Sequence, residues 1–123
     1  MRILFVASEG LPFSKTGGLA DVVEALPKAL VARGHEVAVV LPRYRGTQAS
    51  TVVIPSLTVP LGGRLRFPAI VDGTLLNGVR YFFVDDPGYF DRDGIYGNSV
   101  GDFADNAERY SEFCRAAIQV AEG

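Results

Sequence analysis

The sequence predicts an α/β fold with a partly parallel sheet, helices and a β-hairpin. Two short apolar runs, residues 3–7 and 37–41, enclose a segment with helical periodicity. A strand, a helix and a strand joined by short links form a βαβ unit, and such units build parallel sheets with right-handed crossovers. Further along, Asn77-Gly78 separates two strand-like segments, and this dipeptide is the strongest hairpin signal in the chain.

The first strand is expected at Ile3–Ala7, a continuous apolar run of the kind that is buried on both faces of a sheet. The next segment has apolar residues at helical spacing, which should form one buried stripe. That stripe consists of Leu19, Val22, Val23, Leu26 and Leu30. Pro27 should kink the helix because it has no N–H to donate, and Gly34 is a natural C-terminal cap. Val37–Leu41 is the second strand of the unit.

The middle of the chain predicts strands of a more irregular kind. Residues 51–60 and 64–76 contain prolines, which favour edge positions, and the hairpin should pair the second of them with residues 79–84. Residues 85–101 are rich in Asp, Gly and aromatic side chains and are expected to form a loop. A capping box at residues 105–108 then predicts a final helix. Its apolar positions are Ala107, Tyr110, Phe113, Cys114, Ala117, Val120 and Ala121.

The composition excludes several classes of function. A net charge of −2 and the lack of a basic tract argue against nucleic acid as a partner. Cys114 is the only cysteine, which excludes an intrachain disulfide and a zinc site built on cysteines. No apolar run approaches the roughly 20 residues of a membrane helix, so we expect no membrane partner and a cytoplasmic location. A parallel α/β sheet usually adds a strand after such a final helix, and its lack here favours the front part of a longer protein.

The turn between the first strand and its helix carries an unusual group of residues, Lys15-Thr16-Gly17-Gly18. Such a turn lies at the carboxyl end of the sheet, where open α/β sheets bind ligands. The start of the helix offers unpaired N–H groups, glycines let a ligand approach the backbone, and Lys15 adds a full charge. Together these features predict a phosphate site.

Three other interpretations of this turn fit the residues to different degrees. A Walker A loop requires G-x-x-x-x-G-K-[ST], whereas here the spacing is one residue short and the glycine pair follows the lysine. The dinucleotide fingerprint G-x-G-x-x-G is absent. The third interpretation, glycines that serve a tight turn beside a solvated lysine, is left open by the residues alone.

Residues 8–22, SEGLPFSKTGGLADV, resemble the opening signature of bacterial glycogen synthases and plant starch synthases. The resemblance continues in the family's order along essentially the whole chain, through ALPKAL, RGHEVAVVLPRY, FFVDDP, YFDRDGIYGN and DNAERYSEFCRAA. KTGGLADV is highly specific to this family, whereas RGHEV is common to many glycosyltransferases of the same fold.

The resemblance implies a retaining glucosyltransferase of the GT-B architecture, with two Rossmann-like domains and no metal or other cofactor. Members of the family transfer glucose from ADP-glucose to the non-reducing end of an α-1,4-glucan. Residues 1–123 would then be a truncated N-terminal Rossmann-like domain, and its partner would be the missing C-terminal domain of the same chain. The alternative from another class is a non-catalytic anion- or sugar-binding α/β domain.

The resemblance also implies roles for individual residues, none of them catalytic. Lys15 matches the lysine that faces the ADP-glucose phosphates, and Gly17 and Gly18 match the backbone donors beside it. Asp21 matches an aspartate near the nucleotide-sugar site, although an acid in the first turn also favours the helix dipole. Tyr96 matches a cleft tyrosine that would stack on a glucose ring; its alternative role is a loop aromatic that fills the domain edge.

Several other residues have more ordinary interpretations. His35 lies in the turn at residues 33–36 and is expected to be structural. Arg43 follows the second strand and points either into the cleft or into solvent. Cys114 falls on the apolar stripe of the last helix and is expected to be a buried thiol. Four aspartates lack the spacing of a calcium loop and are expected to serve turns instead. They are Asp85, Asp86, Asp91 and Asp93.

Overall fold

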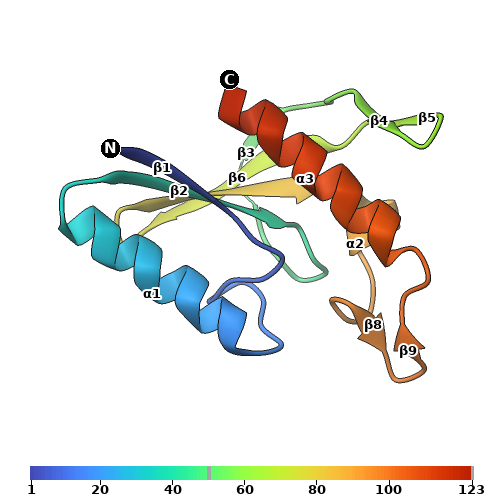
Figure 1. Ribbon diagram of the computed structural model, residues 1–123, viewed down its shortest axis with the longest axis horizontal. Helices are drawn as coiled ribbons and strands as arrows, with labels where there is room; N and C mark the ends of the chain where they lie inside the picture. The colour runs from blue at the N-terminus through green and yellow to red at the C-terminus, as the bar shows by residue number, and fades with distance from the viewer. Residues whose placement is uncertain (50, 123) are drawn as a thin grey trace.

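The computed structural model describes residues 1–49 and 51–122, which form an α/β fold around a five-stranded sheet (Figure 1). The strands of this sheet, in spatial order, are β1 (Arg2–Val6), β2 (Glu36–Pro42), β7 (Val79–Asp85), β6 (Ala69–Leu76) and β3 (Thr51–Ile54). β1, β2 and β7 are parallel, whereas β6 and β3 run antiparallel to their neighbours. The predicted partly parallel sheet is therefore confirmed.

Two helices cover opposite faces of the sheet, α1 (Gly18–Ala32) and α3 (Asn106–Glu122), and the strands pass between them (Figure 1). The period of two along β2 explains how both faces are filled. Val37, Val39 and Leu41 pack in the core on the α1 side, while Val40 packs in the core on the α3 side. All four are buried, and complete burial of such a side chain contributes about 1.5–3 kcal/mol.

Helix α1 ends as the sequence predicts. Gly34 has a φ of 93°, its N–H donates to the Val31 carbonyl, and the His35 N–H donates to the Leu30 carbonyl. This is the Schellman arrangement, which satisfies carbonyls that the end of a helix leaves free. Within the helix, Pro27 is buried and α1 continues through it as one 15-residue segment.

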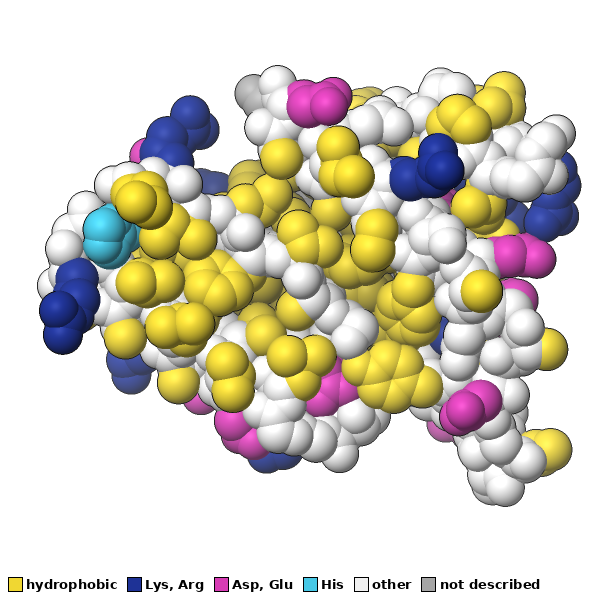
Figure 2. Space-filling view, viewed as in Figure 1, with side chains coloured by type: hydrophobic (Ala, Val, Ile, Leu, Met, Phe, Trp, Pro, Cys, Tyr) yellow, Lys and Arg dark blue, Asp and Glu magenta, His cyan; other side chains and the backbone are white. Residues whose placement is uncertain are grey.

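The predicted apolar stripe of α1 is only partly correct. The helix buries Ala20, Val23 and Pro27 against the sheet. Leu19, Val22 and Leu26 are 44–55% exposed instead. The helix is apolar on more than one side, so periodicity could not select the side that meets the sheet. The exposed side belongs to a surface rich in hydrophobic side chains that lies between α1 and α3 in the same view (Figure 2).

The hairpin is confirmed, with Asn77 at φ 53° and Gly78 at φ 79° between the paired residues Leu76 and Val79. Positive φ at both central residues is what a tight two-residue hairpin turn requires. Each of the two irregular segments predicted before residue 77 forms two separate strands. Residues 51–60 split into β3 and β4 (Val59–Leu61), and residues 64–76 split into β5 (Arg64–Arg66) and β6. β4 and β5 pair only with each other, as a separate small hairpin.

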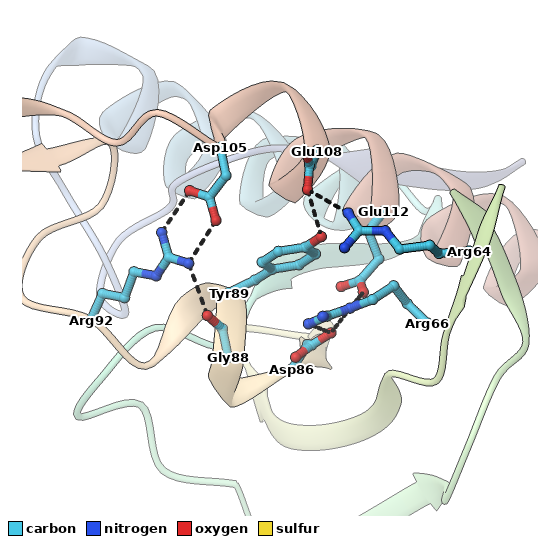
Figure 3. A network of polar contacts seen from close by, with 9 residues as sticks. All are labelled: Arg64, Arg66, Asp86, Gly88, Tyr89, Arg92, Asp105, Glu108 and Glu112. Carbon is cyan, nitrogen blue, oxygen red and sulfur yellow. Dashed lines mark hydrogen bonds and ion pairs between the residues drawn. The ribbon is translucent and has the colours of Figure 1, made fainter. Parts of the chain in front are cut away.

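The segment expected to be a loop contains regular structure. It holds the short helix α2 (Pro87–Phe90) and a two-stranded ribbon of β8 (Gly97–Asn98) and β9 (Gly101–Asp102). The predicted capping box does not form, because both of its side chains bind elsewhere (Figure 3). Asp105 accepts two hydrogen bonds from Arg92 at 2.7 Å, and Glu108 accepts from Arg64 and Tyr89.

Helix α3 buries polar residues that the sequence pattern did not single out. Its buried residues are Arg109, Glu112, Phe113, Ala116 and Ala117. Cys114 is exposed, so the prediction of a buried thiol is wrong. The Arg109 side chain is fully buried and donates to the carbonyls of Tyr89 (2.7 Å) and Ile95 (2.9 Å), which replace the water that its charge loses. The buried face of α3 is therefore rotated from the predicted apolar stripe to include an arginine and a glutamate.

The β4–β5 hairpin is held against α3 by Arg66 (Figure 3). Its guanidinium lies 2.7 Å from Asp86 and 3.2 Å from Glu112, and it stacks over the Tyr89 ring at 3.8 Å. Two carboxyl groups thus share one arginine, and the Glu112 side chain has no exposed surface. Burial, together with the neighbouring Asp86, raises the pKa of Glu112 to about 8.

The Glu112→Gln variant should change how stability depends on pH. An unfolded glutamate titrates near pH 4.3, so between that pH and pH 8 the folded wild-type chain keeps a proton that the unfolded chain has lost. The free energy of unfolding should therefore fall across this window as the pH rises, and Glu112→Gln should flatten the decline. Urea unfolding at pH 5 and pH 8.5 measures it, with Glu108→Gln, whose side chain is half-exposed, as the matched control. Equal pH slopes in wild type and Glu112→Gln would contradict the assignment.

Candidate functional site

The candidate site is built by the loop from Ala7 to Gly17, which joins the carboxyl end of β1 to the start of α1. The loop folds back on the core at Gly10. A Cβ atom at this position would lie 2.8 Å from Val23 Cγ1 and 3.3 Å from the Leu41 methyl groups. Hydrogen bonds from Leu11 N–H to the Ala20 carbonyl and from Ser14 N–H to the Gly10 carbonyl fix the rest of the loop. Its position is therefore set by close packing on α1 and β2.

Glu9 lies inside this loop and is the residue around which it is organised. Its side chain is buried and accepts four hydrogen bonds. They come from Thr16 N–H (3.1 Å), Thr16 Oγ1 (2.6 Å), Gly17 N–H (3.0 Å) and Tyr96 Oη (2.8 Å). Burial alone would raise the pKa of Glu9, but these hydrogen bonds hold that pKa below its ordinary value. Glu9 is therefore an anion seated beside the N-terminus of α1.

Lys15 and Asp21 lie on the outer side of the same turn. The Lys15 ammonium is 3.0 Å from both carboxylate oxygens of Asp21, and the two side chains are 46% and 55% exposed. Asp21 also stands in the first turn of α1, as its alternative interpretation predicts. The pair places an accessible cation beside the start of the helix.

Gly17 and Gly18 present bare backbone at the start of α1. Gly17 has an extended backbone, with a φ of −158°, that any residue can adopt. A Cβ atom added to either glycine would meet nothing within 4 Å. A tight turn is therefore not the reason for the glycine pair. The Gly17 N–H already donates to Glu9, while no described residue accepts a hydrogen bond from the Gly18 N–H.

Tyr96 contacts this loop although it lies 79 positions after Gly17 in the chain. Its hydroxyl lies 2.8 Å from Glu9 Oε2 and 2.6 Å from Ser8 Oγ, and its half-buried ring is 5.8 Å from the ring of Tyr110. Burial raises the pKa of Tyr96 to about 12, so its hydroxyl stays protonated and donates a hydrogen bond to Glu9. The structure thus gathers every site residue predicted from the sequence around one turn. They are Lys15, Gly17, Gly18, Asp21 and Tyr96.

The sequence interpretation missed three residues of this arrangement. Glu9 and Ser8 open the motif at residues 8–22, but no chemistry was assigned to either of them. Tyr44 follows β2, donates from its hydroxyl to the Ser8 carbonyl at 2.6 Å, and contacts the Tyr110 hydroxyl at 2.8 Å. The position of Ser8-Glu9 directly after the first apolar run was the signal that could have identified them. That run forms β1, which is a half-buried edge strand and is not buried on both faces as expected.

The ion pairs of the remaining candidates join residues outside the loop at 7–17. Three of the four aspartates pair with arginines, as Asp85 with Arg43, Asp91 with Arg45 and Asp86 with Arg66. Arg43, which the sequence placed either in the cleft or in solvent, borders a hollow of about 290 Å³ together with Arg45 and Asp85. His35 is half-buried in the turn after α1, as expected of a structural residue.

The fold and this turn define an α/β protein whose candidate ligand site lies where its parallel strands end. A family model described as the starch synthase catalytic domain matches residues 2–123. The chain therefore belongs to the starch synthase catalytic domain family, and the resemblance found in the sequence is confirmed.

Individual relatives agree with this family. The chain is 54% identical over 121 residues to a glycogen synthase of Koribacter versatilis and 48% identical over 128 residues to one of Streptococcus pneumoniae, which covers 97% and 99% of this chain. It spans 25% of the length of each. Among solved structures, the catalytic domain of starch synthase IV from Arabidopsis thaliana, bound to ADP and acarbose, matches with a TM-score of 0.76 and 32% identity. That match covers 97% of this chain and 24% of the plant chain.

Within residues 1–49 and 51–122, no helix has the length and apolar character needed to cross a membrane.

Alanine substitutions at the loop glycines should separate packing from ligand access. Gly10→Ala forces a methyl group against Val23 and should cost about 1–3 kcal/mol of stability. Gly18→Ala meets open space and adds a better helix former, so its melting temperature should equal or exceed that of the wild type. Thermal unfolding of both variants measures this contrast. A Gly18→Ala variant as unstable as Gly10→Ala would show that the fold itself requires the glycine.

Proposed function

We propose that this chain is the front part of the N-terminal Rossmann-like domain of a cytoplasmic, retaining glucosyltransferase of the GT-B type. The whole enzyme transfers glucose from ADP-glucose to the non-reducing end of an α-1,4-glucan. The observation that carries the proposal is an accessible lysine beside bare glycine backbone at the start of α1, in a chain of the starch synthase family. The plant relative bound to ADP and acarbose supports a nucleotide and a glucan as ligands.

In this proposal Lys15 exchanges Asp21 for the donor diphosphate. An exposed ion pair contributes about 0.2–1 kcal/mol, whereas a hydrogen bond to a charged group contributes about 1.5–3 kcal/mol. The exchange is therefore favourable, and Asp21 serves to hold the lysine at the turn until the donor arrives. As the glycosidic bond breaks, negative charge grows on the leaving diphosphate. In this proposal Lys15 and the Gly18 N–H stabilise that charge.

The two other predicted contacts, Gly17 and Tyr96, are already engaged by hydrogen bonds within the turn. Gly17 can donate to a phosphate only if the Glu9 carboxylate releases or shares its N–H. The hydroxyl of Tyr96 is engaged by Glu9 and Ser8, so the partly exposed ring is what remains for a glucose unit to stack on. We assign no catalytic residue within residues 1–123.

The second candidate function is a non-catalytic anion- or sugar-binding α/β domain. The same turn favours it, because a lysine and free backbone N–H groups bind an anion whether or not a reaction follows. Transfer of labelled glucose to glycogen by the full-length protein distinguishes the two functions.

Lys15→Gln in the full-length protein should lower its affinity for ADP-glucose by about 10- to 150-fold. This change is the equivalent of the roughly 1.5–3 kcal/mol that one charge-assisted contact contributes. The matched control is Lys28→Gln, because Lys28 is an exposed lysine within α1, the helix that follows the Lys15 loop, and lies beyond its first turn. Steady-state kinetics with ADP-glucose give KM and kcat for each variant. If Lys15→Gln behaves like Lys28→Gln, Lys15 does not contact the donor.

The 123-residue chain alone should bind ADP-glucose weakly, near millimolar Kd, and should not transfer glucose. One lysine and a few backbone donors that face water are poorly preorganised, and about 4 kcal/mol of binding energy corresponds to that affinity. The hydrophobic surface between α1 and α3, together with the free edge of β1, should also favour self-association (Figure 2). Titration calorimetry measures the binding, a glucose-incorporation assay measures the transfer, and sedimentation measures the self-association. Micromolar binding or measurable turnover would mean that residues 1–123 hold a complete site.

A further inference from the structure

We infer that Glu9 is a positioning residue for the donor site: its carboxylate occupies the anion position at the start of α1 and so fixes where Lys15 stands. This inference rests on the proposed function. It adds a role to a residue whose side chain is buried inside the turn. It also implies that a diphosphate meets the Lys15 and Gly18 side of the turn, because the Thr16 and Gly17 N–H groups already have an anionic partner.

The first support is the way in which the Glu9 charge is satisfied. The side chain is buried, yet none of the ion pairs of the described residues includes it. Four neutral donors and the positive end of the α1 dipole replace water around the carboxylate. A buried anion with this many donors is expensive to remove, because its loss leaves two backbone N–H groups and two hydroxyls without their acceptor.

The second support is that the donors flank Lys15 directly. Thr16 gives both its N–H and its hydroxyl to Glu9, and the next N–H along the chain, that of Gly17, binds the same carboxylate. Two consecutive residues are thereby held to one side chain. Lys15 immediately precedes them, so its Cα position follows from theirs. The long lysine side chain then needs only the Asp21 contact to stay beside the start of α1.

The third support is that Glu9 is itself anchored from distant segments. Tyr96 donates to Glu9 and contacts Ser8, whose carbonyl accepts from the Tyr44 hydroxyl. Tyr44 contacts Tyr110 on α3, and the Tyr110 hydroxyl also donates to the Ile95 carbonyl. Glu9 is thus tied to the segment after β2, to α3 and to the segment before β8. Movement of any of these would be transmitted to the turn that carries Lys15.

The test compares Glu9→Ala, Glu9→Gln and the control Glu24→Ala in the full-length protein. Glu24 is a partly buried glutamate of α1 that makes none of the hydrogen bonds of the turn. Hydrogen exchange is followed in the peptide of residues 8–22, which contains the Thr16 and Gly17 amides. Glu9→Ala should speed exchange there at least 10-fold, Glu9→Gln should restore much of the protection because its amide oxygen can still accept, and Glu24→Ala should have no effect.

Kinetics separate a positioning role from a purely structural one. Glu9→Ala should raise the KM for ADP-glucose about 10-fold and leave the KM for glycogen unchanged, with partial rescue by Glu9→Gln. Because Glu9 acts through Lys15, Glu9→Ala should add little in a Lys15→Gln background. Unchanged exchange in the 8–22 peptide, or a full Glu9→Ala effect in that background, overturns the inference. Absence of transferase activity in the wild type overturns the proposed function instead, and titration with ADP then decides the role of Glu9.

Discussion

The parallel pairing of β1, β2 and β7 is the constraint on which the rest of the structure depends. Strands that run in the same direction end at the same edge of the sheet, so the loops that follow them are neighbours. The turn after β1, Tyr44 after β2 and the segment after β7 therefore meet, although they are up to 88 positions apart in the chain. The hydrogen bonds among Glu9, Tyr44 and Tyr96 are consequences of this arrangement.

Helix positions follow from the same sheet. The alternation of β2 and β7 side chains between two cores requires cover on both faces, which α1 and α3 supply. The cover on the α3 side is partly polar. Arg109 is solvated by carbonyl groups, and Arg66 joins Asp86 and Glu112 between the small hairpin and α3. Most of their polar atoms have partners, although Arg109 Nη2 and Glu112 Oε1 are buried without one among the described residues. These contacts tie the irregular segments to α3.

Family membership and geometry contribute different parts of the functional argument. The family identifies the chain with starch synthase catalytic domains and leaves the roles of single residues undefined. Geometry shows an accessible Lys15–Asp21 pair outside the turn and an enclosed Glu9 anion inside it. In the function that we propose, the turn has two anion positions of opposite character, one filled by Glu9 and one that the donor diphosphate would occupy. Two glycines with nothing near their missing side chains form the surface of the open one.

The sequence by itself determined those features that depend on neighbouring residues. The βαβ unit, the Asn77-Gly78 hairpin and the Gly34 cap were predictable because local patterns and backbone preferences decide them. The family signature likewise pointed to Lys15, Gly17, Gly18, Asp21 and Tyr96. Only the tertiary structure decided which side of α1 is buried, that Cys114 is exposed and that the side chains of the predicted capping box bind arginines instead. It alone also decided that Glu9 accepts from Tyr96. These outcomes depend on partners far away in the chain, and periodicity carries no information about which distant side chain a buried charge will meet.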